Sequence, residues 1–272
     1  TDELKSSLTQ SLGSTLSLDP AALDALLFTN RPRLGDALLS HVIVAANQGG
    51  TDLPVPVGEF PALFDQLNKF SLAWSGLKLD LAFLPFLLVT GPRMGWADIA
   101  ALPVTAPPTA VFDPWRRLVS AAALQNSTFT PEESLFAFIE QAIAQSIDPA
   151  SFLLDDFLAQ LSAWTAWPLA DVTYLTGSRG FNLALPSAMR DERALLAMKE
   201  VFDLIRTSGV SVAQAHSWTI EELGYVQTQA IKQGLSPAFA PERWLDVLGT
   251  IQDQLRTLKR DALLGQALNH LG

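Results

Sequence analysis

Apolar residues recur at intervals of three and four positions along almost the whole chain, and Leu and Ala occupy most of these positions. This spacing places apolar side chains on one face of an α-helix. Alternating runs of Val, Ile, Thr and aromatic residues, which would indicate strands, are nearly absent. The pattern therefore predicts an all-α fold, an irregular stack of helical hairpins with no substantial sheet.

The periodic segments are bounded by glycines, prolines and capping residues, which predict where helices begin and end. The predicted helices cover residues 2–12, 19–28, 34–48, 58–77, 79–90, 96–101, 113–126, 131–146, 149–165, 169–175, 188–208, 211–217, 219–234 and 241–270. Four of them are expected to begin at a capping residue: Asp19 before Pro20, Thr130 before Pro131, Asp148 before Pro149, and Thr219 with Glu222.

Two stretches, 47–61 and 102–114, carry prolines at a spacing that neither a helix nor a central strand tolerates. Both are expected to be surface connections, and the second is the better candidate for a boundary. The sequence thus predicts an N-terminal helical sub-bundle over 1–108 and a C-terminal one over 109–272, which ends in a long amphipathic helix. One continuous helical domain is the alternative.

Three segments share a pattern in which one helix ends, a small residue turns the chain, and a bulky apolar residue precedes a short helix. They read VTGPRMGWADIAALP, LSAWTAWPLADVTYLTG and IRTSGVSVAQAHSWT. In these turns Gly91, Gly95 or Gly209 is expected to permit the left-handed conformation that ends a helix. Trp96, Trp167 and Val210 are expected to fill the corner between the two helices of each pair.

Composition removes several classes of function. The net charge of −10 opposes non-specific binding of nucleic acid, which requires clustered Lys and Arg. The chain has no cysteine, so disulfides, thiolate metal sites and cysteine nucleophiles are excluded. The longest apolar run, 79–91, is too short to cross a bilayer and contains Asp80 and Pro85, so it is expected to be a buried helix.

No arrangement of residues indicates an active site, a metal site or a cofactor site. The histidines, His41, His216 and His270, lie far apart, and none has a partner at metal-ligand spacing on its own helix. The sequence contains no nucleophile elbow, phosphate-binding loop, zinc-protease motif or dinucleotide fingerprint. Neighbouring carboxylates occur at 132–133, 155–156 and 221–222, where helix N-termini explain them. We expect no catalytic, cofactor-binding or metal-binding residue, and no cofactor.

Seven tryptophans could form a platform for carbohydrate rings. Most of them stand beside helix ends or on apolar faces, which favours a packing role. They are Trp74, Trp96, Trp115, Trp164, Trp167, Trp218 and Trp244.

The final predicted helix carries an apolar stripe that runs from Trp244 through Leu255 to Ala267, while most charged residues lie on its other side. If this stripe is core, Trp244→Ala or Leu255→Ala should cost roughly 2–5 kcal/mol. The segment resembles a helix of the A subunits of bacterial Tc insecticidal toxin complexes. The matching positions are Trp244, Ile251, Asp253, Leu255, Arg256, Arg260, Asp261, Ala262 and Leu263. Less specific similarity to the same family extends over the segments LLFTNRPRL, MGWADIAAL and FDPWRRLVSAAAL and over the hairpin segments.

The resemblance, which includes the related A proteins of Salmonella virulence plasmids, implies a secreted or cell-surface protein. Subunits of that family form homopentamers in which an α-helical shell surrounds a translocation channel, and toxin B and C subunits supply the enzyme that is delivered. This chain would be a non-enzymatic piece of the shell that does not itself insert into a membrane. Its expected partners are other A protomers, the B and C subunits and possible receptors on host cells. The alternative is a stand-alone helical scaffold or adaptor that binds a partner protein.

Overall fold

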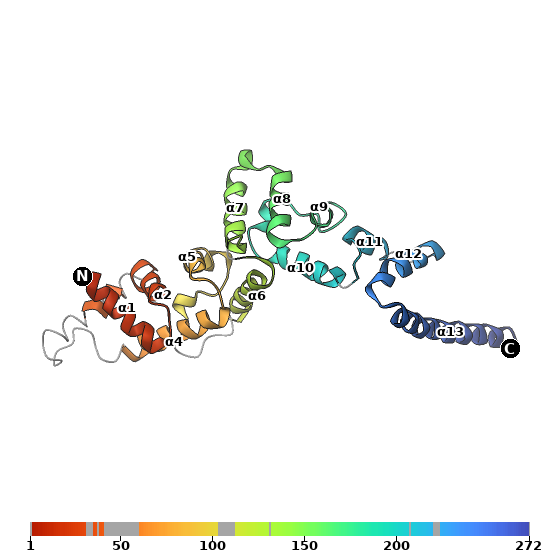
Figure 1. Cartoon of the computed structure of the whole chain (residues 1–272), viewed down its shortest axis with the longest axis horizontal. Coiled ribbons are helices and arrows are strands. Elements are labelled where there is room, and N and C mark those ends of the chain that lie inside the picture. Colours follow the sequence, from red (N-terminus) through yellow and green to blue (C-terminus); the bar gives the residue numbers. More distant parts are fainter. Residues whose placement is uncertain are drawn as a thin grey trace. The chain divides into compact units, whose positions relative to one another are not determined.

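The computed structural model describes residues 2–30, 35–36, 38–40, 60–102, 112–130, 132–206, 208–219 and 224–271. These residues form helices joined by turns and contain no strand, which confirms the predicted all-α fold (Figure 1). They belong to two compact units. Unit 1 consists of Thr1–Ala166 and Ala184–Leu196, and unit 2 consists of Trp167–Leu183 and Ala197–Gly272. The boundary predicted between 108 and 109 lies outside the described residues and stays a prediction.

Unit 1 is built from short helices in chain order. They are α1 (Asp2–Leu16), α2 (Pro20–Asp24), the π-helical η1 (Ala25–Asn30), α4 (Phe60–Leu77), η3 (Leu81–Phe83), α5 (Leu84–Val89), η4 (Pro92–Met94), η5 (Ile99–Ala101), α6 (Phe112–Thr128), α7 (Leu135–Ile147), η7 (Pro149–Ser151), α8 (Leu154–Thr165), η8 (Ser187–Met189) and the first residues of α10 (Arg193–Arg206). The helix predicted over 34–48 lies almost entirely outside the described residues.

The core of unit 1 draws apolar side chains from most of its helices. Its fully buried large side chains are Leu23, Leu27, Leu67, Phe70, Leu84, Leu87, Ile99, Leu118, Leu124, Leu135, Phe138 and Phe157. The run 79–91 forms η3 and α5 rather than one helix, and it is buried on one face only: Leu84 and Leu87 are buried, whereas Val89 is 52% exposed. No described helix alone has the length and apolarity to cross a bilayer. The segments 64–77 and 81–89 reach that length and apolarity only when they are taken together, and they are bent by 118° relative to each other.

The predicted helix starts are right at Asp19 and wrong at two other positions. Asp19 Oδ1 accepts a hydrogen bond from Ala21 N at 2.7 Å, as an N-cap should. Helix α7 begins after Ser134 rather than Thr130, and Ser134 Oγ accepts from Ala137 N at 3.1 Å. Asp148 precedes only the one-turn η7 and makes no side-chain cap, while α8 starts later, after Leu153.

The late start of α7 has a long-range cause. The side chain of Gln125, buried in α6, accepts a hydrogen bond from Leu135 N at 2.7 Å. Its amide group donates to the carbonyl oxygen of Thr130 at 3.0 Å. These two bonds satisfy the backbone on both sides of the turn, so the chain can remain non-helical up to Ser134.

The corner at Trp96 packs as predicted. Gly95, with φ of 83°, is the glycine that supplies the left-handed conformation, whereas Gly91 has a right-handed φ of −51°. Gly91 is needed for space, because a Cβ there would lie 2.7 Å from the Leu87 carbonyl oxygen and 3.2 Å from the Trp96 ring. The Trp96 ring is 3% exposed and contacts Phe86 and Phe136.

Unit 2 contains α9 (Leu169–Thr176), the rest of α10, α11 (Val212–Ser217), α12 (Tyr225–Leu235), η9 (Ser236–Ala238) and α13 (Pro241–Leu271). Trp167 stacks on Phe202 of α10 with ring centroids 4.5 Å apart, and Gly209 is left-handed with φ of 68°. Ser211 is the N-cap of α11, and buried Asp171 of α9 accepts a further hydrogen bond from Val212 N, the first residue of that helix, at 2.9 Å. The predicted capping box reaches Glu222, which lies outside the described residues, and α12 begins only at Tyr225.

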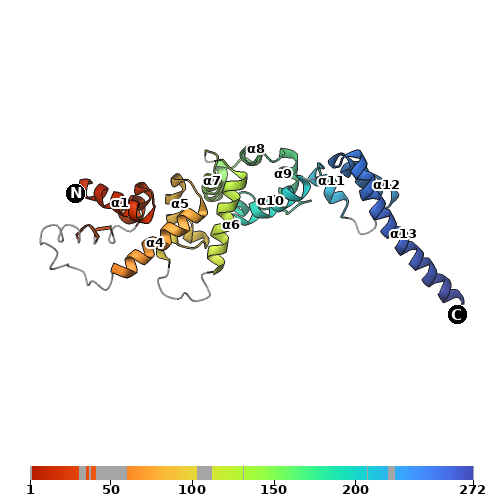
Figure 2. The ribbon, with the colours of Figure 1, turned by 60° about the horizontal axis from the view of Figure 1, so that its bottom comes forward.

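Helix α13 is one uninterrupted helix of 31 residues (Figure 2). Trp244 is half-buried and stacks on Phe239, with ring centroids 5.6 Å apart. Three leucines of the apolar stripe beyond it are exposed, Leu245 by 69%, Leu258 by 66% and Leu263 by 67%, and so is the neighbouring Leu264, by 54%. Leu248 of the stripe is half-buried. The exposed leucines therefore do not belong to a core formed by the described residues. The side chain of Leu255 lies outside the description.

The exposure of Leu258 predicts a small effect of truncation. Leu258→Ala should change the free energy of unfolding of the chain by no more than about 0.5 kcal/mol, because no core contact is lost. Leu161→Ala is the matched control, since Leu161 of α8 is completely buried and its truncation should cost about 2–5 kcal/mol. Urea denaturation followed by circular dichroism measures both. Similar losses in the two variants would contradict the exposed placement.

Candidate functional site

The histidine singled out by the sequence has one side-chain partner. His216 of α11 lies with its Nδ1 2.7 Å from the hydroxyl oxygen of Tyr174 of α9, and its ring meets the tyrosine edge-on. The pair is exposed, and the nearby carboxylate of Asp171 is already used by Val212 N. Among the residues that the structure describes, no third group joins this pair, so it resembles a surface hydrogen bond more than a catalytic triad. His41 and the side chain of His270 lie outside the description.

The neighbouring carboxylates do not converge on a ligand. Asp155 and Asp156 are exposed in the first turn of α8, where they complement the positive end of the helix. Glu132 and Glu133 precede α7, and 221–222 lies outside the described residues. Among the residues that the structure describes, no three His, Asp or Glu side chains come together as metal ligands.

None of the seven tryptophans is exposed. Trp74, Trp96 and Trp167 are buried, while Trp115, Trp164, Trp218 and Trp244 are half-buried. A platform for sugar rings needs an open aromatic face, so these rings serve packing, as the sequence predicted.

The strongest polar cluster joins three segments of unit 1 around Glu192, which is 1% exposed. Arg117 of α6 donates from Nε to Glu192 Oε1 at 2.7 Å and from one terminal nitrogen to Oε2 at 2.8 Å. The other terminal nitrogen donates to the carbonyl oxygen of Met94 at 2.7 Å. The indole of Trp96 also donates to Glu192 Oε2, at 2.8 Å. Both carboxylate oxygens and most guanidinium donors are therefore satisfied.

The hydrogen bonds to Glu192 raise the pKa of Arg117. Burial lowers this pKa, and the negative charges of Glu192 and Asp191 raise it further, so the net change is upward. A cation with a raised folded-state pKa contributes stability at every pH below its ordinary value, and the contribution is lost only as the pH rises through the raised value.

Arg117 should therefore give no pH dependence to unfolding between about pH 6 and 9. Denaturation of wild type and of the double variant Arg117→Met with Glu192→Met at several pH values measures the contribution as a difference, because this variant leaves no unpaired carboxyl group behind. A difference that changes steadily across this range would contradict the assignment of a permanently charged guanidinium.

A hollow of about 340 Å³ lies beside this cluster. Its lining comprises Asp113, Arg116, Arg117, Ser120, Glu192, Arg193 and Leu196. The two exposed cations are already paired, Arg116 with Asp113 at 3.4 Å and Arg193 with Asp191 at 3.7 Å. With every charge matched, the hollow offers no free group to an anionic ligand, and the cluster acts as a clamp between α6, the Trp96 corner and the start of α10.

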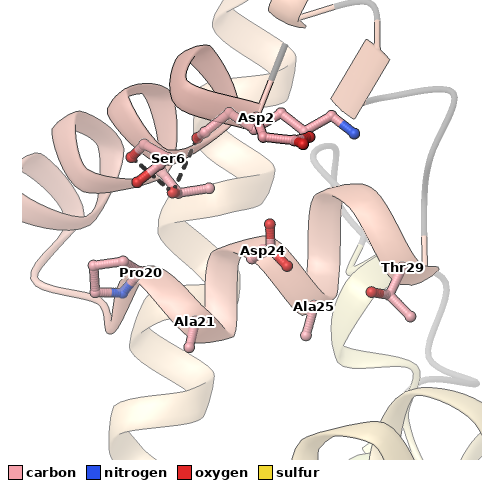
Figure 3. A pocket seen from close by; sticks show the side chains of 9 residues that line it. Asp2, Ser6, Pro20, Ala21, Asp24, Ala25 and Thr29 are labelled. Atoms are coloured by element: carbon pink, nitrogen blue, oxygen red, sulfur yellow. Dashed lines mark hydrogen bonds between the residues drawn. The ribbon is translucent and has the colours of Figure 1, made fainter.

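A second hollow, of about 430 Å³, lies between α1 and α2 (Figure 3). Asp2 and Ser6 border it on α1, and Figure 3 shows the carboxylate of Asp24 on the side of α2 that faces α1. Lys5 also lines it and places its Nζ 4.9 Å from the centre of the Phe28 ring. The lining includes small alanines and Thr9, whose hydroxyl donates to backbone carbonyls within α1. No nucleophile paired with a base appears there.

The sequence reading missed the Arg117–Glu192 pair, whose members are 75 positions apart. The spacing of residues in α6 contained one indication of this pair. Arg117 shares a helix face with Ala121 and Leu124, both buried, so a charge stands in line with core positions. A charged residue on a buried face requires a partner, but the sequence alone does not say which of the many acids supplies it.

Comparisons with known proteins add no further identification. The chain matches no known protein family, no curated protein and no solved structure. The functional reading therefore depends on the residues themselves and on the geometry described above.

Proposed function

We propose that the chain is a non-enzymatic structural segment of a bacterial Tc toxin A subunit, part of the helical shell of a complex that delivers a toxic enzyme into target cells. The observation that carries this proposal is the exposed apolar stripe of α13. The same helix holds the residues on which the resemblance depends, among them Asp253, Arg256 and Asp261.

The stripe is costly for a helix that stands alone in water. Burying one leucine side chain contributes about 1.5–3 kcal/mol relative to leaving it exposed. Covering the four exposed leucines of α13 with another protein surface would therefore contribute a large favourable free energy of association. Large exposed apolar surfaces usually mark contacts with other proteins. A shell made of stacked helices supplies such contacts along the whole length of α13.

The polar side of α13 suits the same role. Arg260 pairs with the neighbouring Asp261 at 2.8 Å, and Arg256 approaches Asp253 at 3.6 Å. These exposed pairs leave the helix with charges of both signs beside its leucines, a pattern typical of helices that lie between neighbouring helices.

The absence of catalytic architecture among the described residues also favours a structural role. Both oxygens of the buried Glu192 carboxylate accept hydrogen bonds from Arg117 or Trp96, and no described carboxylate is hydrogen-bonded to the exposed Tyr174–His216 pair. An enzyme would be expected to place a perturbed, incompletely paired group in a cleft.

Electron microscopy of the complete native protein that contains this sequence tests the proposal. We expect large fivefold particles with a helical shell. The variant Leu258→Ser should weaken assembly, while Leu72→Ser is the matched control, because Leu72 of unit 1 is exposed to nearly the same extent, 67% against 66%. A native protein that remains monomeric would contradict the proposal and favour the helical adaptor. Equal effects of the two variants would contradict the assignment of α13 as the assembly face.

A further inference from the structure

The turn between α7 and α8 exposes three aliphatic side chains within eight residues. Ile147 ends α7 and is 78% exposed, while Leu153 and Leu154 lead into α8 and are 64% and 49% exposed. We name residues 147–156 the α7–α8 tip. Figure 1 shows α7 and α8 as a hairpin with this turn between them. Aliphatic groups in this number at one turn are unusual, since turns are mostly polar.

The tip is held in one conformation by its own bonds. Asp148 N donates to the carbonyl oxygen of Ala144 at 3.0 Å, and the hydroxyl of Ser151 donates to the carbonyl oxygen of Asp148 at 2.8 Å. The ring of Phe152 packs edge-on against Phe157, with centroids 5.5 Å apart. A surface that is already ordered loses little conformational entropy when it binds.

The ring contacts fix the tip to the unit 1 core. Phe157 is 1% exposed, and its centroid lies 4.8 Å from that of Phe138, which is completely buried. Phe152 could therefore turn away only by leaving this stack. The packing of Phe152 on Phe157 holds the turn in place, while the three aliphatic side chains beside it remain exposed to water. Their exposure therefore belongs to a rigid surface.

The α7–α8 tip also carries three carboxylates. Asp148, Asp155 and Asp156 are all exposed. Within the described part of the chain, no Lys or Arg forms an ion pair with any of them. Asp155 and Asp156 lie in the first turn of α8, where their negative charges interact favourably with the positive end of the helix. Their exposed carboxylate oxygens can still bind a cation from outside.

We propose that the α7–α8 tip is an interaction surface that inserts its aliphatic side chains into an apolar hollow of a different protein, with Lys and Arg around the rim of that hollow. The apolar side chains supply the anchor, and the carboxylates select a basic rim. The proposal goes beyond the proposed function and does not depend on it.

Charge decides between this partner and two other occupants. A second copy of the chain carries a net charge of −10 and would on average repel the tip. An anionic bilayer surface would repel three carboxylates as well, and its apolar interior would strip them of water at high cost. A basic protein surface is the occupant that matches both the leucines and the acids.

Photo-cross-linking in the cells that produce the complete native protein tests this proposal. A benzophenone amino acid replaces Leu153 in one variant and Leu72 in a control variant, because Leu72 is similarly exposed elsewhere in unit 1. Mass spectrometry then identifies the attached peptide. We expect adducts from position 153 alone, to one other protein, at an apolar segment flanked by Lys or Arg.

Binding of that identified protein, once purified, supplies the second measurement. Leu153→Ser should weaken binding by about tenfold or more, as expected for an anchor side chain. Asp155→Asn together with Asp156→Asn should weaken it and reduce its dependence on salt. If this double variant fails to fold by circular dichroism, Asp148→Asn replaces it, because Asp148 makes no side-chain cap.

Several results would overturn the proposal. They are adducts with lipid, adducts with a second copy of the chain, equal labelling from positions 153 and 72, and no adduct at all. An attached segment without basic residues, or binding that the aspartate variants leave unchanged, would also overturn it.

Discussion

Replacing Arg117 with methionine should reduce the free energy of unfolding of the protein by about 3–5 kcal/mol. The substitution removes the charged partner of a carboxylate that is 1% exposed and leaves Glu192, among the described residues, with only the indole of Trp96 as a donor. Burial of an unpaired charge is among the most destabilising changes available to a core.

Chemical denaturation measures this loss of stability. Two further variants test whether the loss comes from breaking the Arg117–Glu192 pair. Arg116→Met is the matched control, because Arg116 is adjacent in sequence but its side chain is 62% exposed and its pair with Asp113 is weak. The double variant Arg117→Met with Glu192→Met should regain much of the stability, since an apolar pair of similar volume often replaces a buried ion pair well. Equal effects of Arg117→Met and Arg116→Met would show that the clamp is not buried.

Replacing Phe138 with alanine should cost about 3–5 kcal/mol, the range measured for aromatic rings removed from cores. Phe138 is completely buried, and its ring lies 4.8 Å from that of Phe157 and 6.1 Å from that of Trp164. The two neighbouring rings cannot close around the vacated space without leaving their rotamers, so a cavity is expected to remain.

Thermal melting and urea denaturation check the prediction for Phe138. Phe112→Ala is the control, because Phe112 lies in the same unit and is 70% exposed. The control should change the free energy of unfolding by no more than about 0.5 kcal/mol. If Phe138→Ala melted like the wild type, the packing of α7 against α8 would be wrong.

Local patterns predicted the helical class and many helix positions. Helix α9 is predicted over 169–175 and runs over Leu169–Thr176, because its apolar spacing and the preceding Pro168 are both local signals. Helix α4 ends at Leu77 as predicted. Local hydrogen bonding likewise made Asp19 a recognisable cap.

Long-range contacts explain the failures. The start of α7 depends on Gln125, a side chain from another helix, and the pairing of Arg117 with Glu192 depends on how α6 meets the segment before α10. Neither partner can be read from spacing along one segment. The spacing of apolar residues predicted the apolar stripe of α13. The same spacing does not show whether this stripe packs against other helices of the same chain or against another protein.

Hydrogen exchange of α13 tests the central claim most directly, namely that this helix is completed by neighbours in a larger helical assembly. Amide protons across 241–271 are compared between the 272-residue chain and the complete native particle. In the chain alone they should exchange rapidly compared with those of α7, because the helix exposes its leucines and unfolds locally at low cost. In the particle they should be protected by orders of magnitude more. Equal exchange of α13 in the two samples would contradict the account.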